Sequence, residues 1–490
     1  MIPIFLIFFP LICGLLFLFL SGEKVKHLAL ISSLISLILS AYIWIQFNNS
    51  PESVLLKADY AWIPSFGVHF SVAVDGISLL LVLLTNLLFP LILLSSFNKS
   101  YPQYFYTLTM LMQSALLGVF TATDGFLFYV FWESALIPIY FICLLWGGEN
   151  RAKITFKFFA YTLFGSLLML IAFIAVYLKT PGTHSFSINA LYQAGSLLSV
   201  TEQSWIFLAI FVAFAIKMPI FPFHTWQPNT YTTAPTQGTM LLAGIMLKMG
   251  AYGLIRWLIP LVPLGFQKWG FTAIVLSVIG IIYASCLALV QKDFKRLIAY
   301  SSIAHVGLIS AGILCFNLQG LQGGLFQMFS HGLIIVGLFF IGDILSSRTG
   351  TQTMTELGGI VNHAPEFSKW FLIILLGSIA FPLTNGFVGE FLLLNGLYQY
   401  KPLLCFFGGF TVILGAVYML KSYQTLMLGE SNIYKAAGAQ NFKDLTRTET
   451  AVLLPIAILI LILGVYPSPL LKMTEPSVQL LLQNLKMSIP

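Results

Sequence analysis

The sequence predicts an all-α polytopic membrane protein with about 14 transmembrane helices. Of its 490 residues, 58% are hydrophobic and only 8% are charged, whereas soluble domains carry about 25% charged residues. The apolar residues form continuous runs of roughly 18–25 residues, the length of a helix that crosses a bilayer. Lipid offers the backbone no hydrogen bonds, and these runs are too long and uninterrupted for barrel strands, so we expect helices.

The first predicted span, 2–20, has no basic residue before it and no small-residue cleavage site after it. We therefore interpret it as a retained helix rather than a signal peptide. Further apolar windows follow along the whole chain. The predicted spans are 2–20, 27–46, 77–97, 105–122, 125–145, 155–178, 204–223, 236–258, 271–290, 297–316, 325–345, 369–397, 403–427 and 450–470.

Basic residues are divided unevenly among the predicted loops. Loops after odd-numbered spans hold fifteen Lys and Arg, whereas loops after even-numbered spans, with the C-terminal tail, hold seven. The positive-inside rule places both termini on the non-cytoplasmic side. The absence of a transit peptide favours a bacterial plasma membrane over an organellar inner membrane. The net charge of +7 is explained by these loops, so no nucleic-acid partner is expected.

Two predicted spans contain helix breakers. The seventh carries Pro219 and Pro222, and the twelfth carries Pro382, Asn385 and Gly386. Proline cannot continue a helix of ordinary pitch. The two broken helices lie five spans apart, so each is the fourth member of a five-helix unit. Tandem units with an odd number of spans must lie in opposite orientations, which predicts two inverted repeats with the broken helices at the ion path.

This reading divides the chain into four segments. They are 1–104 with helices 1–3, 105–260 with the first antiporter-like unit (helices 4–8), 261–430 with the second, inverted unit (helices 9–13), and 431–490 with a C-terminal loop and helix 14.

Several ionisable residues fall toward the middle of predicted spans. A charge in the bilayer core costs about 2.5 kcal/mol or more, so it is tolerated when it is paired or lines a wet cavity. The candidate functional residues are Glu133, Lys217, Lys248, His305, His331 and Glu390.

Each candidate also has a structural interpretation. A lysine can snorkel to the interface, but Lys248 lies on the order of 15 Å from either end of its span, beyond its reach. Lys217 is nearer an end, so snorkelling is the stronger alternative there. Glu133 could only neutralise a lysine, and a lone histidine such as His305 is often a hydrogen-bonded core residue.

Together these groups have the chemistry of a proton relay. Burial disfavours the charged form of a lysine, and a nearby carboxylate favours it, so a small movement decides whether Lys217 holds its proton. Histidine changes charge near neutral pH. Carbonyls freed at proline breaks can hold the water that carries protons between side chains. The position of Lys217 directly before Pro219 and Pro222 is consistent with this chemistry.

The sequence indicates no cofactor in this chain. Its five cysteines fall in apolar runs without CxxC spacing, which argues against iron–sulfur clusters, zinc and disulfides and favours core packing. His305 and His331 lie on different spans without further ligands at metal-binding spacing. No haem-attachment motif, dinucleotide fingerprint or phosphate loop is present.

Several ordered segments resemble one family, the antiporter-like membrane subunits of respiratory complex I, the proton-translocating NADH:quinone oxidoreductase. The matching segments are FWESALIPIYF, WGGENR, AFAIKMPIFPFHTW, LLAGIMLKMGAYGLIR, KDFKRLIAYSSIAHVG, FSHGLIIVGLFF and NGFVGEF. They extend over about residues 75–430.

The resemblance implies fourteen spans, two inverted units and a hydrophilic axis through the membrane middle. It also implies roles: Glu133 and Lys217 as the charge pair of the first unit, Lys248 as the central relay, His305 and His331 as links, and Glu390 as the terminal group. Sister subunits of the family resemble one another in having lysine at the last position.

The resemblance further implies partners. These are other membrane-arm subunits, with sister antiporter-like subunits on either side, and lipids. FMN, iron–sulfur clusters and quinone are expected in partner subunits. The alternative function is that of a subunit of a multi-subunit sodium/proton antiporter, whose motifs are similar; a scaffold role is a third possibility, disfavoured by the number of buried charges.

The chain departs from the family after HTW. Relatives often read LPDAHTEAPT, whereas this chain reads QPNTYTTAPT, with Asn229, Tyr231 and Thr233 in place of acidic and histidine residues. The six candidate residues are unaffected. The departure puts in doubt any role of these three positions in proton uptake.

Overall fold

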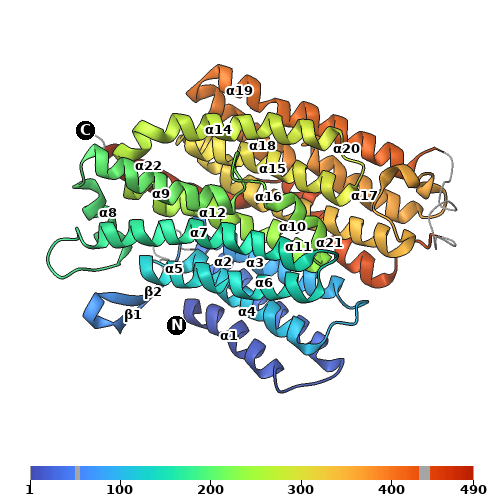
Figure 1. The fold of residues 1–490 in the computed structure, drawn as a ribbon, viewed down its shortest axis with the longest axis horizontal. Helices are drawn as coiled ribbons and strands as arrows, with labels where there is room; N and C mark the ends of the chain where they lie inside the picture. Colours follow the sequence, from blue (N-terminus) through green and yellow to red (C-terminus); the bar gives the residue numbers. More distant parts are fainter. Residues whose placement is uncertain (1, 50–55, 430–441, 489–490) are drawn as a thin grey trace.

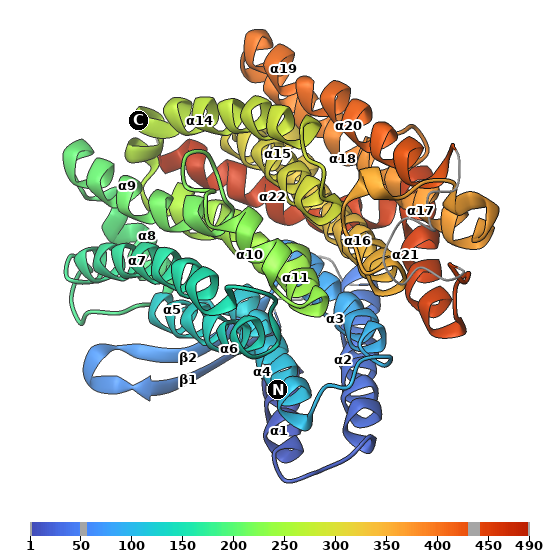
Figure 2. The ribbon, with the colours of Figure 1, turned by 45° about the vertical axis from the view of Figure 1, so that its right-hand side comes forward.

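The computed structural model describes residues 2–49, 56–429 and 442–488, and most of these residues are helical (Figure 1). Residues 431–441 of the predicted segment 431–490, with Lys435 of the basic loops, lie outside this part. Long helices run side by side, so their ends gather at two opposite faces (Figures 1 and 2). The predicted all-α polytopic fold is confirmed.

Within the described residues, eleven helices are long and apolar enough to cross a membrane. Each falls on one of the fourteen predicted spans. The other three predictions fall on the 16-residue helix Ile2–Phe17, on Gln103–Thr121, and on a helix pair interrupted between residues 378 and 385.

The N-terminal segment contains a small sheet that the sequence analysis did not predict. Its two antiparallel strands lie outside the helical bundle, at the same end of the molecule as the C-terminus (Figure 1). The elements are α1 (Ile2–Phe17), α2 (Lys24–Asn49), β1 (Leu56–Ile63), η1 (Pro64–Phe66), β2 (Val68–Val74) and α3 (Gly76–Ser95).

The predicted first unit contains both ordinary and interrupted helices. Its elements are α4 (Gln103–Thr121), α5 (Gly125–Ser134), α6 (Leu136–Trp146), α7 (Arg151–Tyr177), α8 (Ile188–Ser196), α9 (Val200–Lys217), α10 (Gln227–Thr233), α11 (Thr236–Leu241), η2 (Leu242–Met246), α12 (Leu247–Gly253), η3 (Leu254–Leu258) and α13 (Ile259–Leu261). The last five form one continuous span, in which η2 and η3 are π-helical.

The predicted second unit and the C-terminal segment follow. Their elements are α14 (Pro263–Leu289), α15 (Phe294–Leu314), α16 (Leu318–Thr349), η4 (Met354–Glu356), η5 (Ile360–Asn362), α17 (Pro365–Ser378), α18 (Asn385–Tyr400), α19 (Pro402–Gly408), α20 (Phe410–Met427), α21 (Arg447–Val465) and α22 (Ser468–Ser488). Helix α22 was not predicted; it packs against α3 and α16.

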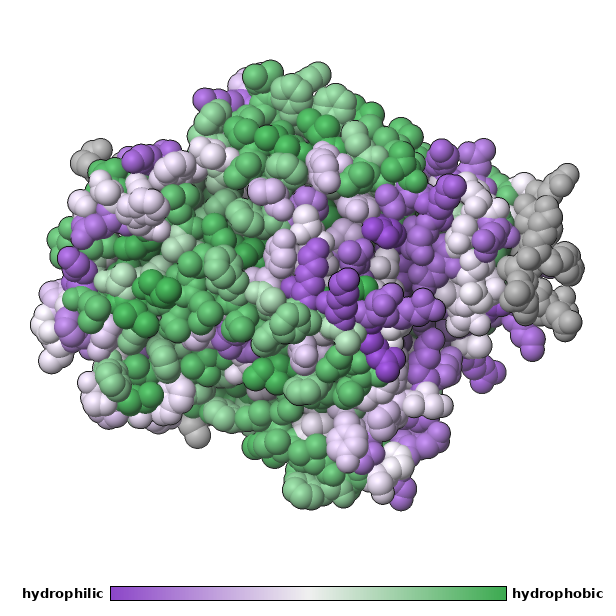
Figure 3. Space-filling view, viewed as in Figure 1, coloured by the Kyte–Doolittle hydropathy of each residue, from purple (hydrophilic) through white to green (hydrophobic). Residues whose placement is uncertain are grey.

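Four spans form the interior of the bundle. Over an 18-residue apolar window of each span, the share of buried residues is 100% in Thr236–Leu261 and in α16, 94% in α15 and 89% in α3, against 33% in Lys24–Phe47 and in Pro402–Met427. Figure 3 shows the outer face, where hydrophobic side chains cover the middle of the helices and hydrophilic ones gather toward both ends, most densely at the end away from the strands. The apolar middle fits the hydrocarbon layer of a bilayer.

Both predicted breaks are present, with shifted positions. Helix α9 ends at Lys217, because Pro219 disfavours helical backbone at Met218 and cannot donate to the helix. The chain then turns over residues 218–226 before α10. In the twelfth span the break covers residues 379–384, and Asn385 and Gly386 begin α18 rather than interrupt it.

The two interrupted helices lie five spans apart, as the inverted-repeat hypothesis requires. The division into units at residues 105, 261 and 431 stays a prediction.

Gly386 is expected to be required for the second break. A Cβ atom at this position would lie 2.1 Å from the carbonyl oxygen of Gly377, a contact that only a backbone shift relieves. Gly386→Ala should therefore lower the free energy of unfolding by roughly 1–3 kcal/mol. Gly415→Ala is the control, since the added Cβ would be 3.6 Å from the nearest side-chain atom. Thermal unfolding of the detergent-solubilised protein measures both; equal midpoints would contradict the prediction.

Candidate functional site

Lys217 is the last residue of α9 and lies at the first break. Its side chain is 3% exposed, so it does not snorkel to the interface. The ammonium lies 5.2 Å from the centre of the Trp132 ring, a cation–π contact. In the part of the chain that the structure describes, its Nζ forms no hydrogen bond. The break thus presents a buried cation with an aromatic ring as its contact.

Glu133 lies at the end of α5, next to Trp132. Its side chain is half-buried, and its buried Oε1 has no hydrogen-bond partner among the described residues. The charges of Glu133 and Lys217 act on each other, but no ion pair within 4.0 Å joins them among the described residues. The predicted pair is therefore within electrostatic range but not in contact.

A helix interruption directly follows Glu133, and the sequence analysis did not predict it. Helix α5 ends at Ser134 and α6 begins at Leu136. Pro138 explains the interruption, because it has no N–H to donate to the carbonyl four residues earlier, that of Ser134. Both members of the predicted pair thus lie at helix ends.

Lys248 lies on α12, between the two π-helical segments of the most buried span. Its Nζ donates to the carbonyl oxygen of Ala243 at 2.6 Å and lies 2.9 Å from Nδ1 of His331. The π-helical pitch of η2 changes the hydrogen-bond register of the preceding turn, so the Ala243 carbonyl can accept from a side chain. The Lys248 amine is therefore held by two specific contacts inside the protein and does not reach the membrane–water interface.

His331 connects this lysine to α15. Its Nε2 lies 3.2 Å from the Ser302 hydroxyl, and its ring centre lies 6.1 Å from that of His305. Each imidazole has one nitrogen that donates and one that accepts when it is neutral, so a proton arriving at one nitrogen can leave from the other.

The series ends at Glu390 on α18. Its Oε1 lies 2.8 Å from Nδ1 of His305 and accepts from Nε2 of Gln327 at 3.4 Å. Beside it, the Tyr418 hydroxyl donates to Ser301 at 3.0 Å. The structure therefore brings Lys248, His331, His305 and Glu390 into one connected group, and keeps Glu133 and Lys217 apart from it.

Sequence reasoning missed the neutral members of this group. Ser302 and Gln327 are common types in apolar helices, where a hydrogen bond back to the helix is the usual role. The position of Gln327, one helical turn before His331, was the available signal, since residues four apart lie on the same face. A small cavity lies against the group and is lined by Ser301, His305, Gln327, His331 and Ser378 among others.

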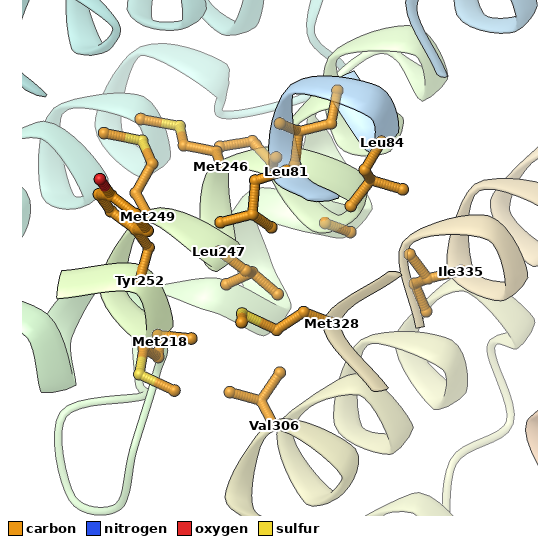
Figure 4. Close-up of a cluster of buried hydrophobic side chains, with 14 of the residues drawn as sticks. Leu81, Leu84, Met218, Met246, Leu247, Met249, Tyr252, Val306, Met328 and Ile335 are labelled. Carbon is orange, nitrogen blue, oxygen red and sulfur yellow. The ribbon is translucent and has the colours of Figure 1, made fainter. Parts of the chain in front are cut away.

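An apolar cluster surrounds the turn that carries Lys248 (Figure 4). It includes Met218, next to Lys217, and Leu247 and Met249, which flank Lys248. Its labelled side chains are Leu81, Leu84, Met218, Met246, Leu247, Met249, Tyr252, Val306, Met328 and Ile335. Four of these are methionines, whose flexible side chains adapt to small shifts. Apolar, deformable packing thus lies beside the chain neighbours of both Lys217 and Lys248.

The described residues contain no group of three or more His, Cys, Asp or Glu that could hold a metal ion. All five cysteines are free thiols. Cys143 and Cys315 are buried, as expected for core packing, but Cys286 is exposed on α14. The core-packing prediction was wrong for Cys286, because a helix on the outside of a membrane bundle can direct an apolar residue toward lipid.

Residues 122–415 match the family model described as NADH:quinone oxidoreductase/Mrp antiporter, transmembrane. The chain belongs to this family of antiporter-like membrane subunits. It is 41% identical to NADH-quinone oxidoreductase subunit M of Rickettsia conorii over 97% of both chains.

Two solved structures share the fold. A chain of respiratory complex I from Thermus thermophilus with bound NADH aligns with a TM-score of 0.89 and 30% identity, over 98% of this chain and 100% of that one. A chain of the Mrp complex from Dietzia sp. aligns with a TM-score of 0.85 and 18% identity, over 98% and 99%. The second likeness concerns the fold alone.

Removing the Lys248 charge should not cost stability. Lys248→Met loses two hydrogen bonds, about 1–3 kcal/mol, but removes the desolvation cost of a buried ion, which is several kcal/mol. The midpoint of thermal unfolding should stay the same or rise. Leu247→Ala, next along the same turn, should lower the free energy of unfolding by about 2–5 kcal/mol. A strong loss of stability in the methionine variant would mean that the charge holds the bundle together.

Proposed function

We propose that this chain is a proton-translocating membrane-arm subunit of an NADH:quinone oxidoreductase. The observation that carries the proposal is the connected series of titratable groups, Lys248, His331, His305 and Glu390, on the interior helices. Ion pairs that only joined helices would need no series of exchangeable protons. The names of the relatives and the similarity to a chain of respiratory complex I support the assignment to this enzyme.

In this proposal the first unit loads the relay. Burial disfavours a charged Lys217, and the Glu133 carboxylate favours it. Since the two groups are in range but not in contact, a small shift at the α5–α6 interruption changes their interaction strongly in a low-dielectric interior. Lys217 then holds its proton when Glu133 approaches and releases it when Glu133 withdraws.

Transfer from Lys217 to Lys248 requires water to cross the methionine-rich cluster. Water enters an apolar space only when it finds polar partners, so the cluster prevents a continuous proton leak while it is closed. Movement of the flexible side chains of Met218 and Met246 would admit water transiently. The cluster thereby separates a loading step from a delivery step.

Delivery then uses neighbouring groups, two pairs of which are in direct contact. Lys248 gives a proton to Nδ1 of His331. Across the 6.1 Å that separates the two ring centres, transfer from His331 to His305 needs a bridging group, and water in the adjoining cavity beside Gln327 would supply it. His305 passes the proton to Glu390. Glu390, which follows the second break, releases it toward the side of the membrane away from the cytoplasm.

The redox chemistry is assigned to other subunits. We place FMN, iron–sulfur clusters and quinone there, and sister antiporter-like subunits on either side of this chain, with lipid around the rest. We place the protein in a bacterial plasma membrane. Both termini would face away from the cytoplasm, because the face with the basic loops would be cytoplasmic.

The alternative is a subunit of a sodium/proton antiporter that works without redox partners. It is the weaker proposal, since its structural neighbour is only 18% identical. Co-purification of the natively expressed chain separates the two: an NADH-oxidising assembly supports the first, and a complex without such activity supports the second.

The first-unit pair is expected to be essential for pumping. Glu133→Gln or Lys217→Ala leaves the other charge without its partner, so the relay should lose most proton pumping while the complex still assembles. The measurement is the proton gradient formed in vesicles during NADH oxidation, normalised to assembled complex. The exposed pair Lys179 and Glu202, 3.4 Å apart, provides matched controls. A normal gradient with either first-unit variant would refute the proposal.

Glu390 should tolerate exchange for another titratable group. Glu390→Lys keeps a proton carrier beside His305 and should pump far better than Glu390→Ala, which removes it. The resemblance to sister subunits with lysine at this position supports the expectation. Protons pumped per NADH oxidised, compared at matched assembly, test it. If the alanine variant pumps like the unmodified protein, the terminal role of Glu390 is wrong.

A further inference from the structure

Lys295 is a buried lysine that the sequence analysis assigned to a loop. The structure places it as the second residue of α15, 4% exposed. Its ammonium lies 3.4 Å from the carbonyl oxygen of Ala234 and, among the described residues, within 4.0 Å of no carboxylate. The charges of Asp343 and Asp293 act on it from farther away. One long hydrogen bond compensates a buried ammonium poorly, and the Lys217 ammonium forms none among the described residues.

Asp343 lies on the solvent side of Lys295. It accepts from the Thr236 hydroxyl at 2.8 Å and pairs with Lys99 at 3.0 Å, and its side chain keeps 13% exposure. A partly exposed carboxylate therefore faces a fully buried lysine within electrostatic range but not in contact. Glu133 and Lys217 have the same arrangement.

A stripe on α16 leads from Asp343 to the relay. Asp343, Phe339, Ile335 and His331 follow one another at intervals of four residues, so they form a line that runs about 18 Å along α16 and turns roughly 120° around it. On the neighbouring α15, Ser302 follows Lys295 by seven residues, about 10.5 Å or two turns. Ser302 contacts His331. Each helix thus carries one polar group near its end and another at the relay.

Buried polar groups lie between the Asp343–Lys295 pair and the relay at His331. Tyr231 of α10 meets the Phe339 ring edge-on at 5.7 Å, one turn inward from Asp343. The side chain of Gln227 approaches its hydroxyl. Within the described residues the Tyr231 hydroxyl and both amide atoms of Gln227 have no hydrogen-bond partner, although both residues are fully buried. Such groups are the partners that an internal water needs.

A cavity also lies beside Lys295. This small cavity is lined by Lys295, Gly342, Thr351 and Gln352 among others. The other carboxylate in range, Asp293, is occupied in capping α15, where it accepts from the N–H of Arg296 at 2.7 Å. Asp343 caps no helix: its carboxylate contacts the side chains of Thr236 and Lys99 and keeps 13% exposure.

We propose that Asp343 and Lys295 form a second carboxylate–lysine pair, through which protons enter the relay from the face of the basic loops. The proposal rests on the proposed function. Asp343 takes a proton from water and passes it to the neutral Lys295 amine. The ammonium gives it, through water held by Gln227 and Tyr231, to Ser302, whose own hydroxyl proton moves to Nε2 of His331. Each step moves one proton and no electrons.

Arginine separates a proton carrier from an electrostatic anchor. Lys295→Arg keeps the positive charge but does not release a proton at any working pH. In the intact complex reconstituted in vesicles, Lys295→Arg and Lys295→Met should both lower proton pumping at least tenfold at matched assembly. Asp343→Asn should lower it severalfold, and Asp343→Glu should keep at least half. Lys99→Met and Lys99→Arg are the matched controls from the same cluster and should stay within twofold of the unmodified protein.

Two results would overturn the proposal. If Lys295→Arg pumps normally, the lysine is an anchor; if Lys99→Met loses as much as Asp343→Asn, the aspartate serves only its ion pair. If the Lys295 variants do not assemble, Tyr231→Phe tests the proposal instead. This variant removes one hydroxyl and should lower proton pumping severalfold. Normal pumping in Tyr231→Phe would refute the proposed route. Lys248→Ala is measured in parallel. Normal proton pumping in Lys248→Ala would refute the proposed function itself. If Lys248→Ala loses pumping while the Lys295 variants pump normally, only the entry route is refuted.

Discussion

The structure depends on one constraint: lipid supplies no hydrogen bonds, so a buried polar group in an apolar bundle costs free energy unless another group of the protein or an internal water compensates it. Lys248 shows how this is met. Its ammonium is held by the Ala243 carbonyl, made available by the π-helical turn η2, and by a nitrogen of His331 from α16. The same contact that compensates the charge also joins two helices and provides a path for a proton. Stability and transfer therefore use the same atoms.

The same constraint explains why helix ends lie inside the bundle. Lys217 ends α9 before two prolines, Glu133 lies at the junction of α5 and α6, and Glu390 lies in the second turn of α18 after the other break. A helix end leaves carbonyl or N–H groups without partners, so these places are the polar points of an otherwise apolar interior. Met218, which follows the first break, and Met246 and Met249, which lie close to Lys248 in the chain, belong to one buried apolar cluster (Figure 4).

Sequence reasoning predicted these elements unequally. The apolar runs located the eleven helices that, among the described residues, are long and apolar enough to cross a membrane. The prolines located both breaks to within a few residues. The strands β1 and β2 were missed, because a short hairpin has no long apolar run. The π-helical turns were missed because their residues, such as Leu242 and Leu254, are ordinary helix formers. Lys295 was counted with the loops, since the predicted span began two residues after it, and its burial comes from helices distant in sequence.

The chain composition and its local patterns were sufficient for the class of protein, the membrane spans, the breaks and the six buried ionisable residues. These follow from transfer free energies and backbone chemistry, which act on each segment separately. Which groups meet was decided by packing between helices: Lys248 with His331, and His305 with Glu390, over separations of 83 and 85 residues. Glu133 and Lys217, which the sequence suggested as a pair, are held apart, because the distance between two side chains depends on how whole helices pack and no local pattern encodes it.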